Sequence, residues 1–274
     1  MKGGIVASLL ALKYTTNPEN VALIIYGDEE YAQRGIEELS AAAMDGVMHL
    51  SPEIIISPES RFNLVHSARG IVVFDMTVRG QRAHSSRPHQ GVDAVKLFYA
   101  AFVQFEREIG VTTKLGKTTT TIARIECGVR GDDSDIITQA GMIPDIVRAT
   151  VAIRNSDLVR RGDDFLAILR AFVEAQGLTV EAASISLDHP TRQTDESVVT
   201  QLCALARERA GVDIQCGDPA LAGYNDAAIL GEAVGAPVVN FGSYGEGNHM
   251  AHEWVSLDSI LKTGEVFISW IDEK

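Results

Sequence analysis

Two kinds of hydrophobic pattern divide this chain of 274 residues. Three segments alternate between apolar and polar side chains: residues 71–79, 118–127 and 146–154. Alternation is typical of strands that bury one face of a sheet and expose the other. Three further segments are short, mainly apolar runs: residues 21–26, 53–57 and 237–241. Such runs indicate strands buried on both faces of a mainly parallel sheet. We therefore predict two different sheets.

The alternating strands belong to a unit in the middle of the chain. Two amphipathic helices separate them. Their apolar positions are Val95, Phe98, Tyr99, Phe102 and Phe105 in the first helix and Phe165, Leu169, Phe172 and Val173 in the second. A last strand at residues 178–185 completes a β-α-β-β-α-β order, which predicts a ferredoxin-like α+β unit. We place it at residues 67–187, with hinges at 67–70 and 188–191.

The remaining segments, residues 1–66 and 188–274, predict an α/β domain. Helical patterns fall near the apolar runs, at residues 5–14, 35–43, 197–210 and 227–234. Helical segments near short apolar runs are typical of helices that cover a central sheet. The chain length suits two domains on a soft prior of about 150 residues for each.

Composition narrows the possible partners and compartment. The formal charge is −13, so an electrostatic footprint for nucleic acid or for an anionic membrane is absent. The three cysteines form no CxxC motif, which argues against a disulfide framework and a thiolate zinc site. Lys2 and the apolar run at residues 5–12 imitate a signal peptide, but an ordinary amphipathic helix is the better interpretation. We expect a cytoplasmic protein.

Metal-binding side chains follow the predicted buried strands. The groups are Asp28, Glu29 and Glu30 after the first run, Glu59 after the second, and His249, His252 and Glu253 after the third. Ligands bind beyond the carboxyl ends of strands in open α/β sheets. Carboxylate oxygens and imidazole nitrogens suit Zn²⁺, Co²⁺ or Mn²⁺. Taken singly, each group is also compatible with a solvated helix start, a turn carboxylate or a surface histidine.

An ordered set of motifs resembles metallopeptidase family 20. The motifs are MKGG at residues 1–4, DEE at 28–30, RAHSSRP at 82–88 and His249 followed four residues later by Glu253. That family includes acetylornithine deacetylase, succinyl-diaminopimelate desuccinylase, aminoacylase and glutamate carboxypeptidases. The resemblance covers the chain in order. It implies a zinc-peptidase-like catalytic domain with an inserted lid and dimerisation domain.

The resemblance implies roles for the metal-binding residues. Glu29 corresponds to the general base, and Glu30, Glu59 and His249 correspond to metal ligands, with His252 as a competitor for the place of His249. A complete site holds two Zn ions, or Co or Mn. The metal lowers the pKa of a bound water, and the base takes its proton as the water attacks the amide carbonyl.

Further roles follow from the same resemblance. His84 resembles the lid histidine that stabilises the developing oxyanion in the partner's site of dimeric members, although a surface histidine is the alternative. Arg154 resembles the arginine that binds the substrate's α-carboxylate, the alternative being a solvated strand end. Asn225 and Asp226 resemble a segment near the substrate, with Asp226 as an orienting or structural residue.

Some positions depart from the family pattern. Glu59 stands in Ser-Pro-Glu-Ser rather than Glu-Pro-Thr, and Gly141 stands where members often have Asn. The family's bridging Asp and its His-x-Asp motif would precede Met1. We therefore expect the chain as written to be N-terminally truncated and to bind metal weakly, which would leave it with little or no activity by itself.

These observations predict a metal-dependent amidohydrolase that cleaves an N-acyl amino acid. A dipeptidase or carboxypeptidase of the same family is the alternative within the enzyme class. A catalytically dead fragment that dimerises or binds a carboxylated metabolite is the non-enzyme alternative. The implied partners are a small N-acyl amino acid or short peptide and a second copy of the chain through the lid, without nucleic acid or membrane.

Overall fold

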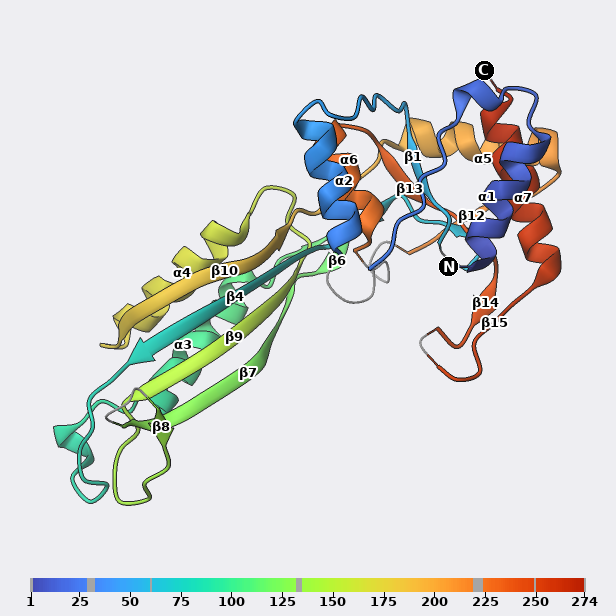
Figure 1. The fold of residues 1–274 in the computed structure, drawn as a ribbon. Helices are drawn as coiled ribbons and strands as arrows, with labels where there is room; N and C mark the ends of the chain where they lie inside the picture. Colours follow the sequence, from blue (N-terminus) through green and yellow to red (C-terminus); the bar gives the residue numbers. More distant parts are fainter. Residues whose placement is uncertain are drawn as a thin grey trace. The chain divides into compact units, whose positions relative to one another are not determined.

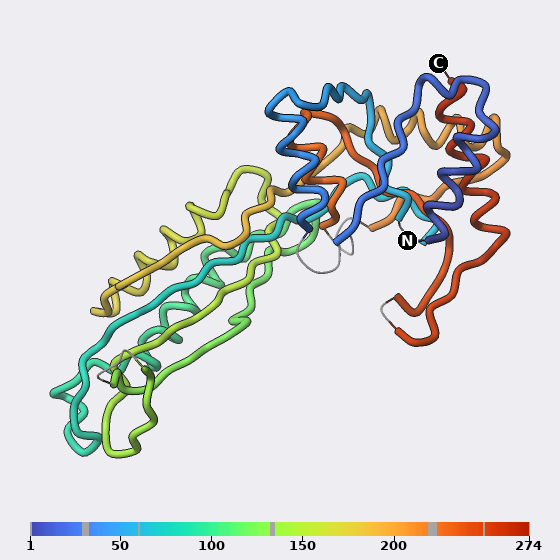
Figure 2. Tube along the Cα trace, viewed as in Figure 1, coloured from blue at the N-terminus to red at the C-terminus, as the bar shows by residue number. Residues whose placement is uncertain are grey.

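The computed structural model describes residues 2–28, 33–59, 61–131, 135–218, 224–248 and 250–273. The chain divides into two compact units. The terminal unit comprises Met1–Ala68 and Arg192–Lys274, and the inserted unit comprises Arg69–Thr191. In Figure 2 the blue and red ends of the sequence share one unit, and the green middle forms the other. The sequence predicts these borders at 66/67 and 187/188.

The inserted unit is built on an antiparallel sheet with the strand order β10-β4-β9-β7-β8. The strands are β4 (Gly70–Arg79), β7 (Thr119–Arg130), β8 (Ile136–Ile137), β9 (Ile146–Asn155) and β10 (Thr179–His189). Helix α3 (Ala94–Ile109) connects β4 to β7, and α4 (Gly162–Ala175) connects β9 to β10. Both helices cover the same face of the sheet (Figure 1). This is the β-α-β-β-α-β order that the alternating pattern predicts.

Smaller elements complete the inserted unit. They are the 3-10 helix η2 (Pro88–Gln90) and the hairpin of β5 (Thr112–Thr113) and β6 (Gly116–Lys117).

Helix α3 shows how local sequence fixes an element of this unit. The Asp93 carboxylate caps the helix by accepting hydrogen bonds from the backbone N–H groups of Val95 and Lys96, a cap typically worth about 1 kcal/mol. Its buried face carries Phe98 and Phe105, each 0% exposed. Tyr99 was predicted on the same apolar face, but it is 62% exposed. One position beyond Phe98, a side chain is turned about 100° around the helix and leaves the core side.

The terminal unit packs helices around short strand pairs. Helix α1 (Lys2–Tyr14) packs against α7 (Leu257–Ile271), α5 (Glu196–Ala210) packs on α7, and α2 (Arg34–Met44) packs on α6 (Asp226–Val234). Its main core includes the rings of Phe241, Phe267 and Trp270. The indole N–H of Trp270 is buried and donates to the Leu202 carbonyl at 2.8 Å. A short 3-10 helix, η1 (Pro18–Asn20), follows α1.

The strands of this unit are shorter than predicted. Strand β1 (Ile55–Ser57) runs parallel to β13 (Val238–Asn240), and β2 (Asn63–Leu64) runs parallel to β12 (Gln215–Cys216). Two antiparallel pairs accompany them: β3 (Ser67–Ala68) with β11 (Arg192–Gln193), and β14 (Gly245–Glu246) with β15 (Trp254–Val255). The predicted mainly parallel sheet is therefore present only as two-stranded pieces in the described part of the chain.

The apolar run at residues 21–26 is a further correction. The sequence predicts a buried strand there, but the structure assigns no strand to it. A strand is defined by hydrogen bonds to a neighbour, which composition alone does not supply. Ile25 is 59% exposed.

None of the helices in the described ranges has both the length and the apolar character to cross a membrane.

Candidate functional site

The candidate site is built around Glu59, two residues beyond strand β1. The preceding Pro58 is approached closely by two glycines. A Cβ on Gly4 would lie 2.2 Å from the Pro58 carbonyl oxygen, and one on Gly242 would lie 2.5 Å from it. No side chain fits at such distances, so glycine at both positions lets α1 and the segment after β13 reach the end of β1. This accounts physically for the second glycine of the MKGG motif.

Two carboxylates meet at this point. Burial raises the pKa of Glu59, the polar side chains of Asn225 and Ser57 act in the opposite direction, and the negative charge of Asp226 adds a smaller rise. Asp226 is 1% exposed and Asn225 is 6% exposed. The burial of the Glu59 and Asp226 carboxylates and the repulsion between their negative charges favour either a proton or a cation at Glu59. The Oδ1 atom of Asn225 is also buried without a hydrogen bond among the described residues.

Gln33 ties the segment after Asp28 to this carboxylate pair. Its Nε2 donates a hydrogen bond of 2.5 Å to Oδ1 of Asp226. Its backbone N–H donates to the Asp28 carbonyl at 2.8 Å, and both Gln33 and Asp28 have positive φ, 55° and 72°. The Arg34 guanidinium, bonded to the Asp28 carboxylate, lowers the pKa of that carboxyl. Gln33 therefore links Asp28 on one side of positions 29–32 to Asp226.

Replacing Gln33 with Ala is expected to lower the free energy of unfolding by about 1–3 kcal/mol, because the buried Asp226 carboxylate loses a donor. Urea denaturation measures the change. Gln201→Ala, at an exposed position of α5 in the same unit, is the control and should stay within about 0.5 kcal/mol of the wild type. Equal stability of both variants would show that this contact contributes nothing measurable.

Of the metal ligands predicted from sequence, the described residues include only Glu59. Among them, no three His, Cys, Asp or Glu side chains are close enough to hold an ion. Glu29, Glu30 and His249 lie outside the described residues. Glu59 fits a divalent cation by its donor chemistry, since oxygen ligands suit Zn²⁺ and Mn²⁺. A cation there would also offset the repulsion from Asp226.

Two predicted site residues belong to the inserted unit. His84 is exposed in the segment between β4 and η2, and its backbone bridges to Met142. Arg154 is exposed near the end of β9, where its backbone pairs with Ile71 and Thr119. The polar end of this strand leaves the guanidinium available to an anion.

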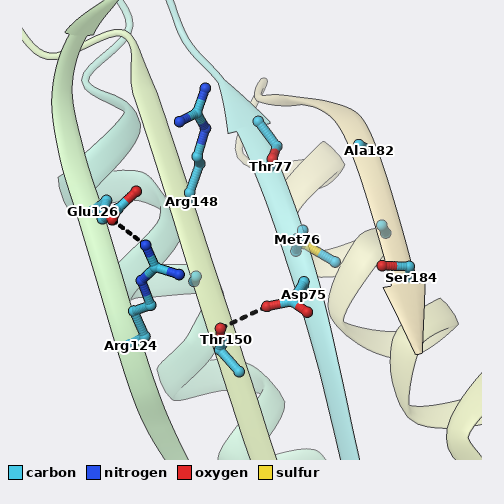
Figure 3. Close-up of a pocket in the computed structure, with 11 residues that line it drawn as sticks. Asp75, Met76, Thr77, Arg124, Glu126, Arg148, Thr150, Ala182 and Ser184 are labelled. Atoms are coloured by element: carbon cyan, nitrogen blue, oxygen red, sulfur yellow. Dashed lines mark hydrogen bonds and ion pairs between the residues drawn. The ribbon is translucent and has the colours of Figure 1, made fainter. Parts of the chain in front are cut away.

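A hollow of about 340 Å³ lies on the open face of the inserted sheet (Figure 3). Arg124 pairs with Glu126 beside it, and Thr150 donates to the Asp75 carboxylate at 2.6 Å. None of the predicted site residues lines it. Within each pair the two polar side chains are partners for one another, as expected on the solvated face of an antiparallel sheet.

Two residues that the sequence does not predict contact predicted site residues, one in each unit. Gln33 holds Asp226, and Ser86 contacts the His84 ring with both its backbone N–H and its hydroxyl oxygen. For Gln33 the sequence signal was its polar side chain, three positions after Glu30. For Ser86 the signal was a serine two positions after His84, a spacing that permits a local side-chain-to-backbone bond.

Known proteins match the chain in sequence and in fold. A probable carboxypeptidase of Aspergillus terreus is 27% identical over 158 residues, which are 52% of this chain and 34% of that protein. The chain therefore spans about a third of the length of this curated relative.

Two solved structures show the fold. Aminopeptidase PepT from Bacillus cereus gives a TM-score of 0.74 at 20% identity, covering 99% of this chain and 70% of that one. A tripeptidase from Staphylococcus aureus gives 0.67 at 18% identity, covering 91% and 64%. The family model described as Peptidase family M20/M25/M40 matches residues 1–273. The chain belongs to this family of peptidases.

Proposed function

We propose that this chain is part of a metal-dependent peptidase that hydrolyses short peptides with a free C-terminal carboxylate. The buried carboxylates of Glu59 and Asp226 at the end of β1 are the observation that carries the proposal. Membership of the peptidase family supports hydrolysis, and the relative described as a probable carboxypeptidase supports a peptide substrate. The N-acyl amino acid predicted from sequence has less support than a peptide.

The proposed mechanism assigns one task to each residue. Glu30, Glu59 and His249 would hold the metal, which supplies a water of lowered pKa when bound. Glu29 accepts a proton from the attacking water and returns it to the leaving amine nitrogen. His84 donates a hydrogen bond to the developing oxyanion, and Arg154 binds the α-carboxylate of the substrate.

A substrate panel tests this function. The protein is equilibrated separately with Zn²⁺, Co²⁺ and Mn²⁺ and assayed with dipeptides, tripeptides, their C-terminal amides and N-acyl amino acids. Because the sequence predicts weak metal binding, each metal is kept in excess during the assay. We then expect metal-dependent hydrolysis of the free peptides and little hydrolysis of the amides. Preference for N-acyl amino acids would favour the deacylase. Metal binding without turnover of any substrate would favour a non-catalytic binder.

Replacing Arg154 with Ala is expected to raise KM for carboxylated peptides, with a loss of about 1–3 kcal/mol of binding, because a charged hydrogen bond is removed. Steady-state kinetics measure it. Arg107→Ala, at an exposed position on α3, is the control and should leave KM unchanged. The assignment is wrong if Arg154→Ala also leaves KM unchanged for free-carboxylate peptides.

We further propose a homodimer formed through strand β7 of the inserted unit. In the described residues β8 pairs only with Val129 and Arg130 of β7, so the preceding part of this long strand has β9 on one side and an open edge on the other. Such an edge is a template for another strand, and Ile125 on it is 47% exposed. A second copy of β7 could extend the sheet.

Light scattering after size exclusion tests the dimer. We expect about twice the chain mass of 29.6 kDa for the wild type and a monomer for Ile125→Lys, because a charge on the edge opposes strand pairing. Val159→Lys alters an exposed apolar residue, 83%, that lies outside the strands of this sheet, and should remain a dimer. A monomeric wild type, or a dimeric Ile125→Lys, contradicts the proposal.

A further inference from the structure

The segment that carries His84 is held in place by backbone hydrogen bonds. The N–H of Ile143 donates to the Ala83 carbonyl and the N–H of Ser85 donates to the Gly141 carbonyl, both at 2.8 Å. These two bonds flank His84 on either side. The position of its backbone is therefore set by a neighbouring loop of the inserted unit, although its side chain is exposed.

A buried carboxylate anchors both loops. Asp145 is 5% exposed; its Oδ2 accepts from Arg82 Nε at 3.0 Å, and its Oδ1 accepts from the Arg130 backbone N–H at 3.0 Å. Its backbone carbonyl accepts from the N–H of Gly80 at 2.9 Å. One residue thus fixes the beginning of the His84 segment and the loop beside it. An ordinary surface histidine needs no such support.

The imidazole itself is held by Ser86. The Ser86 backbone N–H donates to Nδ1 of His84 at 3.2 Å, and the Ser86 hydroxyl lies 2.8 Å from the same nitrogen. A backbone N–H can only donate, so Nδ1 must carry a lone pair. In a neutral imidazole the proton is then on Nε2. The hydroxyl must also donate, because Nδ1 has no hydrogen to give.

We propose that Ser86 is a positioning residue that fixes both the orientation and the Nε2–H tautomer of His84. The inference rests on the proposed function, in which His84 stabilises the oxyanion. Among the described residues Nε2 of His84 makes no hydrogen bond, so this N–H is available to a ligand. A peptide oxyanion needs a donor that is already aimed when charge develops. The other tautomer would present a lone pair and repel it.

Nitrogen NMR of the ¹⁵N-labelled chain tests the tautomer directly. Spectra are recorded at about pH 8.5, where ordinary imidazoles are neutral, and His84 is assigned with His84→Gln. We expect His84 to give the shifts of a single Nε2–H form. His89 on η2 is exposed and makes no hydrogen bond to the described residues, so it should give the shifts of a mixture and serves as the internal control.

Two changes at Ser86 separate the hydroxyl from the amide. Ser86→Ala removes the hydroxyl and should retain the Nε2–H form. Incorporation of lactic acid at position 86 also removes the hydroxyl and replaces the N–H with an ester oxygen, so the comparison with Ser86→Ala isolates the amide. In this ester variant His84 should resemble His89. Unchanged amide spectra of β4 and β9 check that the unit stays folded. The proposal is overturned if wild-type His84 resembles His89, or if the ester leaves its shifts unchanged.

Kinetics then separate this proposal from the proposed function. In a preparation that hydrolyses peptides, the ester variant should lose roughly tenfold in kcat with little change in KM, because the donor is no longer aimed. A tautomer effect in NMR without any peptide hydrolysis would uphold the role of Ser86 and contradict the proposed function. Hydrolysis that is unaffected by the ester would contradict the role of Ser86.

Discussion

Replacing Glu29 with Gln is expected to lower kcat for peptide hydrolysis by about 10²–10⁴, the usual contribution of a general base, without changing the amount of bound metal. The amide has the size of the carboxylate but cannot accept the proton of the attacking water. The flanking residues support such a role, because Gln33 is bonded to both Asp28 and Asp226. Through Gln33, Asp28 is therefore linked to Asp226, whose charge acts on Glu59.

Two further substitutions make this test specific. Glu30→Gln should lower both kcat and the bound metal, measured by atomic emission after dialysis, because the proposed ligand is lost. Glu37→Gln alters an exposed carboxylate in the first turn of α2 and should change neither. If Glu29→Gln retains wild-type kcat, Glu29 is not the base. If it loses metal as Glu30→Gln does, the two roles are assigned the wrong way round.

Replacing Phe105 with Ala is expected to lower the free energy of unfolding by about 3–5 kcal/mol. Phe105 is 0% exposed, and its ring lies 6.1 Å from that of Phe102 in the core of the inserted unit. Removing it costs the transfer free energy of the ring and leaves a cavity against the sheet. Urea denaturation followed by circular dichroism measures the change.

Tyr99→Ala provides the matched control on the same helix. Tyr99 is 62% exposed, so its loss should change the free energy of unfolding by no more than about 0.5 kcal/mol. The two results together test which face of α3 is buried. Similar losses for both variants would contradict the packing described for this helix.

The inserted unit could be predicted from the sequence because each of its long strands shows a clear pattern within a short stretch of residues. Alternation at residues 71–79 and 146–154 already identifies the strands observed as Gly70–Arg79 and Ile146–Asn155. The terminal unit was harder. Residues 21–26 have the composition of a buried strand, but pairing decides whether a strand exists. Helix α7 is not among the predicted elements, although it is amphipathic.

The candidate site shows the same limit. Glu59 could be found because it follows an apolar run, and Asp226 through its resemblance to a family segment. Their surroundings could not be found in this way. The Gln33–Asp226 hydrogen bond joins residues 193 positions apart, and no periodicity relates them. Contacts of this length depend on how helices α2 and α6 pack, which the sequence pattern of either helix does not specify.

The paired strands β3 and β11 have a consequence for the order of folding. Ala68 pairs with Arg192, so this ribbon must close a loop formed by the whole inserted unit. For a disordered loop on the order of a hundred residues, closure costs about 4 kcal/mol in chain entropy. The inserted unit brings its own ends together, since Ile71 pairs with His189. Folding of the inserted unit first would remove most of this entropic barrier, because β3 and β11 would then be joined by a preformed unit whose own ends are already adjacent.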